Sequence, residues 1–560
     1  MIIHNVYFWL KAGTTENNKM KFETSYIYKI AKWQLFFSFL VLQVFISNAQ
    51  DFESSHLPIV VINTQGSDIR DEPKIDADMG IINNSNGLNN VSDPFNDYDG
   101  KIAIEIRGNS TQLFDKKSYG FELRDELGED QDVSLIGLPE EEDWILYASP
   151  IDKTHMRNVI TLELWRKMGY WASNTRYCEL VLNGEYRGTY VLMEKIKRDE
   201  NRLDIARLNP EDTEGDDLTG GYIIRMDWPK GDGWYSKYNS MGGDRLFFQY
   251  LYPKTEDITS QQKLYIRQYI SDFEDALFDG NFVNNDGVRY SSLVGLSSFA
   301  DLFIINELSR SVDAYKISSF IHKDKGSNGG RLKAGPIWDF NLAYGNVVYC
   351  GGSKPSGWTY KQLDNQCDDL SLMPLWWERF MEDEVFKNLV ACRWQDYRED
   401  FLNEAFLFDF IDHQVNELGV AVDRNFEKWN YLGENLWDEP NPVPTTYKGE
   451  IERLKNWFTN RIAWLDKQMI NGDFTITAID ELDSDVTVYP NPFNSSFTMS
   501  FLGLKNMKFQ MTDMSGRLLI SYDDVSDQII IDGVDYLKNG IYLIYLSKDR
   551  IHNRRTLIKN

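Results

Sequence analysis

NELSRSVDAYK, at residues 306–316, and GPIWDFN, at residues 335–341, form the most informative pattern in this sequence. The residues between them predict a β-hairpin, with strands at 317–322 and 332–337 and a turn at 323–330. Asp313 and Asp339 are equally distant from residue 326, which lies inside that turn. Because residues equidistant from a hairpin turn lie opposite each other, we expect both carboxylates to face one space at its open end.

Two carboxylates held close together repel each other unless a cation or a shared proton lies between them. One interpretation is a site for phosphoryl transfer, in which one aspartate orients an acceptor hydroxyl and the other binds a divalent metal on the phosphates. The alternative is that each aspartate only caps a turn, which is the usual role of a single aspartate at a strand end. The paired placement of Asp313 and Asp339 favours the site.

The chain on either side of this pattern changes character. Alternating apolar residues before about residue 260 predict strands, including 58–62, 102–107, 116–123, 144–147, 220–227 and a hairpin over 178–194 that turns at Asn183-Gly184. A helix is expected over 152–168 with Asp152 as its N-cap, and segment 51–98 reads as a polar leading segment with a single strand. Helical periodicity dominates after residue 260. This order predicts an α+β body with two lobes and a cleft between them.

Composition and charge limit the classes of function. Of the 560 residues, 42% are hydrophobic and 26% are charged, which is typical of globular protein and excludes long disorder. The net charge of −27 would repel phosphate backbones, so we expect no nucleic-acid partner.

The N-terminus resembles a secretory signal peptide. Lysines precede an apolar run from Leu35 to Ile46, and Ser47-Asn48-Ala49 has the small-x-small pattern of a cleavage site. Twelve apolar residues are too short to cross a hydrocarbon core of about 30 Å, so we expect no transmembrane anchor. Residues 1–49 are therefore predicted to be a signal peptide, whose true start is either Met1 or Met20.

Four cysteines follow this segment, and none belongs to a C-x-x-C pair that would indicate zinc. Cys350 and Cys367 flank a loop rich in Gly, Ser and Trp, and they are the candidate disulfide of an exported chain. The competing interpretation is that all four cysteines are buried free thiols.

The last 76 residues differ from the rest of the chain. Apolar residues alternate with period two over 485–560, and turn residues interrupt them every 8–12 positions. This pattern predicts an all-β, Ig-like sandwich. Residues 471–484 form the predicted linker between it and the body.

Several fragments together resemble the CotH (spore-coat protein H) kinase-like family, an atypical relative of protein kinases. The resemblance spans residues 57–470 and rests on the helix–Asp–hairpin–WDFN pattern together with IRGNST at 106–111, KKSY at 116–119, DW at 143–144, DKTHMRN at 152–158 and LNGEYRG at 182–188. It implies a two-lobed, kinase-like body that uses ATP and Mg²⁺ or Mn²⁺.

The resemblance also implies roles for individual residues. Asp313 corresponds to the catalytic-loop aspartate, and Asp339 to the metal aspartate. Ser318 stands where kinases usually place a metal-binding asparagine, so Asn341 becomes the candidate second ligand. The nucleotide-binding candidates are four charged residues of the strand-rich half and its helix: Lys117, Arg107, Arg157 and Glu163. Lys116 and Lys117 point to opposite faces of a strand, so only one of them faces the cleft.

The C-terminal region resembles the type IX secretion sorting domain of Bacteroidetes-type bacteria. The resemblance rests on VYPNPF at 488–493, MSGR at 514–517, GIY at 540–542 and a basic tail. It implies passage through the periplasm to the surface or medium, with the type IX machinery as a partner. A generic Ig-like adhesive module is the alternative.

Three functions follow from these observations. The first is an exported kinase that phosphorylates Ser or Thr hydroxyls of secreted or surface proteins. The second is an inactive kinase-like binding or structural protein, whose aromatic residues Trp358, Tyr360, Trp376 and Trp377 would stack on sugars or peptides. The third is a glycoside hydrolase using Asp313 and Asp339, although no further motif supports it.

Overall fold

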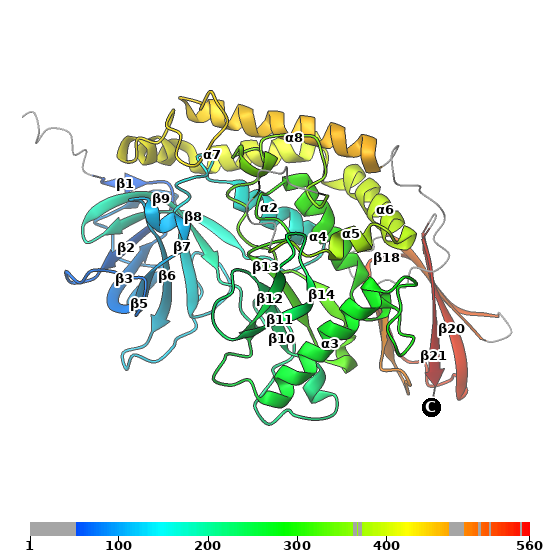
Figure 1. Ribbon diagram of the computed structural model, residues 1–560. Helices are drawn as coiled ribbons and strands as arrows, with labels where there is room; N and C mark the ends of the chain where they lie inside the picture. Colours follow the sequence, from blue (N-terminus) through cyan, green and yellow to red (C-terminus); the bar gives the residue numbers. More distant parts are fainter. Residues whose placement is uncertain are drawn as a thin grey trace, which may run out of the picture. The chain divides into compact units, whose positions relative to one another are not determined.

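The computed structural model describes residues 52–361, 367, 372–469, 486–501, 506–513, 517–548 and 551–559. The predicted signal peptide and the predicted linker lie outside the described residues. In the part of the chain that the structure describes, no helix is both long and apolar enough to cross a membrane. Figure 1 shows the ribbon and the labels of the elements.

The strand-rich part forms a closed seven-stranded barrel in the order β2-β3-β5-β6-β7-β9-β8. Its strands are β2 (Ile59–Asn63), β3 (Ile75–Ile82), β5 (Tyr98–Arg107), β6 (Ser118–Arg124), β7 (Asp143–Tyr147), β8 (Thr175–Leu182) and β9 (Glu185–Glu194). The pair β2–β8 is parallel and closes the barrel, and every other pair in it is antiparallel. Apolar side chains from alternate positions fill its interior, so the barrel is a packed core. Two short strands, β1 (Ser54–Ser55) and β4 (Asn89–Asn90), also occur.

The prediction of one strand in segment 51–98 is wrong, because β3 lies there as well. Ala77, Met79 and Ile81 of β3 are buried in the barrel, while the alternate residues Asp76 and Asp78 are less buried. The alternation was therefore present in the sequence, but aspartate and glycine have low strand propensity, which obscured the strand.

The second part begins with a five-stranded antiparallel sheet in the order β11-β12-β10-β13-β14. Its strands are β10 (Tyr222–Met226), β11 (Gly233–Asn239), β12 (Arg245–Tyr252), β13 (Ser319–Lys323) and β14 (Leu332–Ala334). The β13–β14 pair is the hairpin that the sequence predicts. Ile321 pairs with Ala334, so its centre falls between residues 327 and 328, slightly after the expected residue 326.

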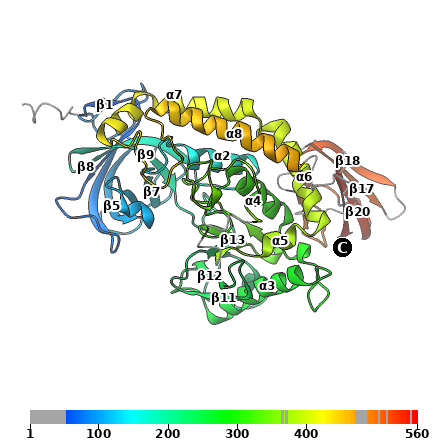
Figure 2. The same cartoon turned by 45° about the horizontal axis from the view of Figure 1, so that its top comes forward.

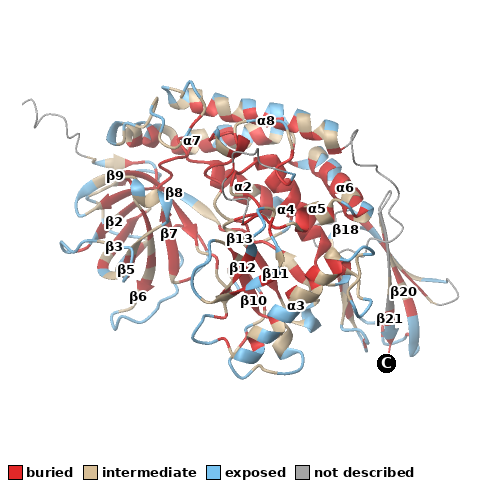
Figure 3. Cartoon of the chain, in the orientation of Figure 1, coloured by how far each residue is buried: buried red, intermediate tan, exposed pale blue. Residues whose placement is uncertain are grey.

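Seven α-helices lie among the described residues. They are α2 (Arg157–Lys167), α3 (Ser260–Phe278), α4 (Leu296–Ser309), α5 (Trp376–Phe380), α6 (Glu384–Asp400), α7 (Glu404–Lys428) and α8 (Tyr447–Met469). Every residue of α4 is buried, as its red colour in Figure 3 shows. Helices α7 and α8 run side by side, and α7 also packs on β9 of the barrel (Figure 2). Single-turn 3-10 helices occur at 110–113, 217–219, 290–292, 326–328 and 349–351.

The helix expected over 152–168 is shorter than predicted, and Asp152 does not cap it. Met156 is the N-cap, and helix α2 begins at Arg157. The Asp152 carboxylate instead accepts hydrogen bonds from the backbone N–H groups of Thr154 and Arg157, at 3.0 and 2.8 Å. It therefore fixes the turn before the helix.

The C-terminal region, taken by itself, is all-β. Strands β15 (Thr487–Tyr489), β16 (Phe497–Phe501) and β19 (Asp527–Ile531) form one sheet, while β17 (Met507–Asp513), β18 (Leu518–Val525), β20 (Gly540–Lys548) and β21 (Ile551–Lys559) form another. Alternate residues such as Phe497, Met499 and Phe501 are buried. The strand content follows the expectation, and the Ig-like arrangement stays a prediction.

Candidate functional site

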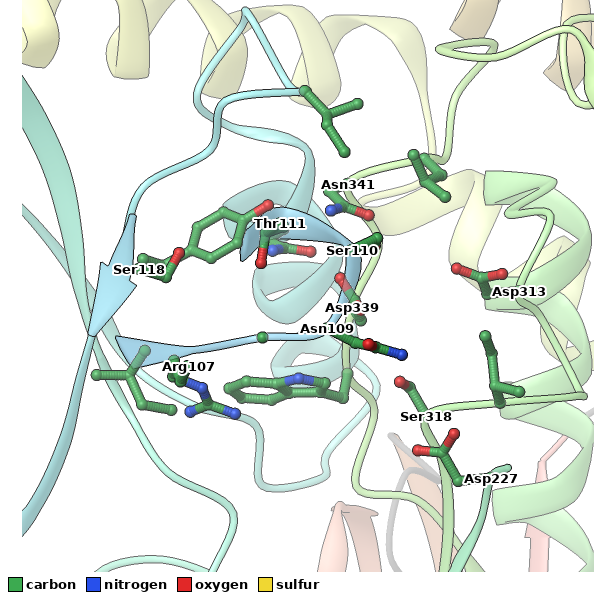
Figure 4. A pocket seen from close by; sticks show the side chains of 18 of the residues that line it. Arg107, Asn109, Ser110, Thr111, Ser118, Asp227, Asp313, Ser318, Asp339 and Asn341 are labelled. Carbon is green, nitrogen blue, oxygen red and sulfur yellow. The ribbon is translucent and has the colours of Figure 1, made fainter. Parts of the chain in front are cut away.

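A cavity of about 560 Å³ lies between the barrel and the sheet–helix part of the chain. The barrel side contributes residues 107–111 and β7, and the other side contributes 313–320 and 338–342. Segment 195–196, which leaves the last barrel strand, and β10 with its following residues complete the wall. Figure 4 shows that Asp313, Asp339 and Asn341 all belong to this cavity. The structure thus brings together the two aspartates that the sequence paired.

Asp313 is placed by the end of a buried helix. Helix α4 stops at Ser309, and Arg310 follows in the left-handed conformation with φ 45°. The Arg310 guanidinium donates to the carbonyls of Gly351 and Gly357, at 2.9 and 2.6 Å, which holds the turn against the next loop. Asp313 therefore reaches the cavity from a firmly anchored turn.

Asp339 follows β14 and lies in the left-handed region, with φ 65°. Burial raises the pKa of its carboxyl to about 6; the nearby Arg107 opposes this rise and the charge of Asp227 adds to it. Among the described residues, no side chain forms an ion pair or hydrogen bond with the Asp339 carboxylate. A carboxylate in this state is well suited to bind a cation.

Asn341, two residues further on, also has a side-chain oxygen without a hydrogen-bond partner. Its side chain is buried, and no donor in the described part of the chain reaches its Oδ1 atom. A buried amide oxygen without a donor costs free energy unless a ligand satisfies it. Mg²⁺ and Mn²⁺ prefer carboxylate and amide oxygens, so Asp339 and Asn341 fit a divalent metal of this class.

Backbone conformations around the site are unusual. Arg310, Tyr315, Ser318, Asp339 and Tyr344 all have positive φ values between 45° and 68° although none is glycine. Such conformations cost about 1 kcal/mol or more each, and they concentrate at functional sites.

The loop after β5 forms the barrel wall of the cavity. Gly108 has φ +97°, and a Cβ atom there would collide with the Thr111 hydroxyl, so the tight turn requires glycine. Arg107 precedes it, with its Cζ 5.4 Å from the centre of the Trp338 ring. Arg107 is therefore the sequence-predicted nucleotide-binding cation that lies in the cavity, and it is close enough to Asp339 to influence its pKa.

Lys117 does not line the cavity. Its ammonium donates to the Gln112 carbonyl at 2.6 Å. The neighbouring Lys116 is the buried one, and its ammonium donates to the Thr189 carbonyl and to Asn425 Oδ1, at 2.6 and 2.8 Å. Burial lowers the pKa of Lys116 well below its ordinary value. The two lysines do face different ways, but neither reaches the aspartates.

Arg157 and Glu163 also lie outside the cavity wall. Arg157 is fully buried, with its guanidinium 2.5 Å from the Asp152 carboxylate and 3.1 Å from the Ala343 carbonyl. Glu163 forms an ion pair with Arg166 on the same helix, at 2.9 Å, and does not line the cavity. Asn158, next to Arg157, does line the cavity and accepts a hydrogen bond from the Phe340 N–H at 2.6 Å.

Sequence reasoning missed a third carboxylate and two cations of the cavity wall, namely Asp227, Arg225 and Lys195. The Arg225 guanidinium lies 3.8 Å from Asp227. Asp227 ends the strand predicted over 220–227, so the signal that could have found it is a carboxylate at a strand end, as for Asp339.

Cys350 and Cys367 are joined by a disulfide, with their Cα atoms 4.8 Å apart. Cys178 and Cys392 take no part in a disulfide. Tyr349, beside the bridge, lines the cavity.

The aromatic residues proposed to stack on sugars or peptides are not available for that role. Trp358, Tyr360, Trp376 and Trp377 are at most 8% exposed. In the core, Trp358 and Tyr360 pack against Phe303. Trp377 packs against Phe299 and Trp376 against Phe248, so this support for a binding module is wrong.

Comparison with known proteins agrees with this picture. Residues 104–465 match the family model described as CotH kinase protein, and residues 487–560 match the secretion system C-terminal sorting domain. No curated protein matches the chain. A solved structure of PorZ from Porphyromonas gingivalis, described as a surface component of the type IX secretion system, is similar at 23% identity with a TM-score of 0.13. That similarity covers 16% of this chain and 13% of the PorZ chain.

The sorting domain indicates export to the cell surface or secretion, and it implies an interaction with the type IX secretion machinery. The match over residues 104–465 covers more than half of the sequence and includes every residue discussed here at the main cavity. The chain therefore belongs to the CotH kinase protein family and ends in a secretion sorting domain.

Proposed function

We propose that this exported protein is a metal-dependent kinase that transfers a phosphoryl group from ATP to Ser or Thr hydroxyls of secreted or surface proteins. One observation carries the proposal: the Asp339 carboxylate forms no ion pair among the described residues although Arg107 is near, lies two residues from a buried amide oxygen without a donor, and shares its cavity with Asp313. In that arrangement Asp339 and Asn341 would hold Mg²⁺ or Mn²⁺, which neutralises charge on the phosphates when bound.

The remaining residues of the cavity fit complementary roles. Asp313 lies across the cavity from the barrel loop and would accept the proton of the acceptor hydroxyl. Arg107 and the N–H groups of the tight turn at 108–111 would bind phosphate oxygens. Ile145, Ile196 and Leu251 supply an apolar wall on which a purine ring can pack.

The test uses the chain without its signal peptide, incubated with labelled ATP and Mn²⁺ or Mg²⁺. We expect label transfer to the chain itself or to an added secreted-protein extract, and a loss of about 10²-fold or more in Asp339→Asn and in Asp313→Asn. The matched control is Asp78→Asn, because Asp78 is an exposed carboxylate on the barrel and does not line the cavity. Equal transfer by all four proteins would overturn the assignment of the two aspartates.

Nucleotide binding separates a kinase from an inactive relative. A metal–nucleotide complex should raise the melting temperature of wild type and of Asp313→Asn, but not of Asp339→Asn. Ser318 lines the cavity at the position where kinases usually have a metal-binding asparagine. Because that ligand is missing, the inactive alternative has to be tested as well. Nucleotide-dependent stabilisation without any transfer would identify the protein as a nucleotide-binding member that does not turn over.

A further inference from the structure

A small cavity, of about 20 Å³, adjoins the main cavity between helix α4 and the β13–β14 hairpin. Asp313, Ser318 and Asp339 line both cavities, and Figure 4 shows their side chains on this shared wall. A polar cavity needs about 10–15 Å³ to hold a water molecule, so this one has room for a single water and for no larger ligand. The small cavity thus adds a water-sized space beside the two aspartates of the candidate site.

Asn306, near the end of α4, lines the small cavity and is 3% exposed. Its backbone carbonyl accepts hydrogen bonds from the Arg310 N–H and the Ser309 hydroxyl, at 2.9 and 3.2 Å. Its side-chain amide forms no hydrogen bond with the described residues. Because a buried amide without a partner is costly, a molecule in the cavity is needed to satisfy it.

A water in the cavity can reach this amide. Neither the Oδ1 nor the Nδ2 atom of Asn306 is shut off from water-sized space, whereas the hydroxyl of Ser311, which also lines the cavity, is shut off. The Ser319 hydroxyl already contacts the Ile317 carbonyl at 3.3 Å. The other residues that line only the small cavity are apolar, namely Leu302, Ala314, Pro336, Ile337 and Phe340. Away from the shared wall, Asn306 is therefore the described residue that offers hydrogen bonds to a water.

The path of the chain brings Asp313 to the same small cavity. After α4 the chain turns back along the helix, and the Tyr315 hydroxyl contacts the Phe303 carbonyl at 3.3 Å and the Glu307 carboxylate at 3.1 Å. Asp313, two residues before Tyr315, thereby lines the cavity together with Asn306. A carboxylate has about four acceptor positions and a water carries two protons, so one water can accept from the amide and donate to the carboxylate.

We propose that Asn306 and Asp313 share an ordered water in the small cavity, and that this water holds the Asp313 carboxylate in the orientation that accepts the proton of the acceptor hydroxyl. Asn306 acts only through the water, so it is a positioning residue. Its effect on the rate rests on the proposed function, because a general base must be within hydrogen-bond reach of the proton that it takes up. The presence of the water does not rest on that function.

High-resolution crystal structures test the water directly, using the chain without its signal peptide and without added nucleotide. In wild type we expect a water within about 2.6–3.2 Å of both the Asn306 amide and the Asp313 carboxylate. Asn306→Leu replaces the amide by an apolar group of similar volume. The water should be lost in this variant, because a buried water needs about two to four polar partners.

The rates of label transfer from ATP test the role of Asn306. Asn306→Leu should lower kcat about ten-fold and change KM for ATP by less than about two-fold, because the residue lies outside the main cavity that takes the nucleotide. Asn306→Ser keeps a hydroxyl group beside the water and should recover most of the lost rate. Asn388→Leu is the matched control: Asn388 is an 8% exposed asparagine of α6 that lines neither cavity, so both constants should stay unchanged.

Three results would overturn the proposal. The wild-type density shows no water between the two side chains, the water bonds to Asp339 in place of Asp313, or Asn306→Leu has the same kcat as the Asn388→Leu control. The first two results need only wild type, so the test does not depend on the folding of a variant.

Absence of label transfer by wild type is a separate result. It contradicts the proposed kinase activity, and the wild-type crystal structure still decides whether Asn306 and Asp313 share the water. The shared water and the kinase activity can therefore fail separately.

Discussion

The body of the chain and its main cavity treat carboxylates in opposite ways. In the body, Asp301 lies 2.5 Å from Arg393, Asp152 lies 2.5 Å from Arg157, and Glu307 lies 3.1 Å from Arg461. In the cavity, the half-buried Asp339 forms no such ion pair among the described residues, although the charge of Arg107 acts on it. A partly desolvated charge without an ion pair is costly, and this is what we expect of a carboxylate whose partner is a ligand.

Among the changes considered, removing one partner of a buried ion pair in the body should lower the free energy of unfolding most. Arg393→Met would leave Asp301 buried with only the hydroxyl groups of Tyr170 and Tyr397, and we expect the free energy of unfolding to fall by about 3–5 kcal/mol. Urea denaturation measures this change. The double variant Asp301→Asn/Arg393→Met should be less destabilised than Arg393→Met alone. An equal loss in both variants would show that the unpaired charge of Asp301 is not the cause of the destabilisation.

A buried carboxyl without an arginine gives the second test. Glu274 accepts hydrogen bonds from Ser236 and Trp376, and burial raises its pKa to about 7. Its stabilising contribution is complete below about pH 4.5 and is lost as the pH rises through 7, amounting to about 2–3 kcal/mol.

Comparison with Glu274→Gln measures that contribution. The difference in unfolding free energy between wild type and Glu274→Gln should fall over this pH range, as measured by urea denaturation at each pH. A constant difference between pH 4.5 and 8 would contradict the raised pKa.

Neutralising Asp339 should stabilise the chain, whereas breaking an ion pair of the body destabilises it. Asp339→Asn removes a buried negative charge that Asp227 also repels, so the ligand-free chain should gain about 1–2 kcal/mol of stability above pH 6. The gain should shrink as the pH falls below about 6, where the folded wild type takes up its proton, and vanish near about pH 4, where the unfolded chain is protonated too. Thermal denaturation without nucleotide or metal is the measurement, and a loss of stability in Asp339→Asn would mean that the carboxylate has a structural role.

Exposed pairs provide the baseline for this comparison. Lys101 and Asp78 lie 2.5 Å apart on the barrel surface, with side chains 51% and 40% exposed. Lys101→Met should leave the urea midpoint of unfolding unchanged within experimental error, because water and salt screen the pair. A clear fall of the midpoint in the same assay would indicate that surface charges also matter to this fold.

Turns and hairpins could be predicted from the sequence, whereas the closure of the barrel could not. The Asn183-Gly184 turn and the β13–β14 hairpin depend on residues close in the chain, and the structure contains both. The barrel closes through the parallel pair of β2 and β8, in which Ile59 pairs with Glu179. No periodicity within either strand encodes a partner more than a hundred residues away, so the barrel could not be derived.

In the candidate site, too, the features that depend on residues close in the chain were predicted, and those that depend on distant strand pairing were not. Asp313 and Asp339 were paired from their spacing around one turn, and they do line one cavity. The choice of Lys117 failed because alternation shows only that two neighbouring residues face different ways, and the direction of the interior depends on the closed barrel. Asp227 was missed because its strand reaches the cavity only through its pairing with β13.

The bridge between Cys350 and Cys367 also sets the timing of assembly. It closes the loop that anchors Arg310, the residue whose turn leads to Asp313, and Tyr349 beside it forms part of the cavity wall. Thiols stay reduced in the cytoplasm and oxidise in the periplasm, so we expect this loop to be cross-linked during export rather than before it. The turn that carries Asp313 would then reach its final anchoring outside the cytoplasm.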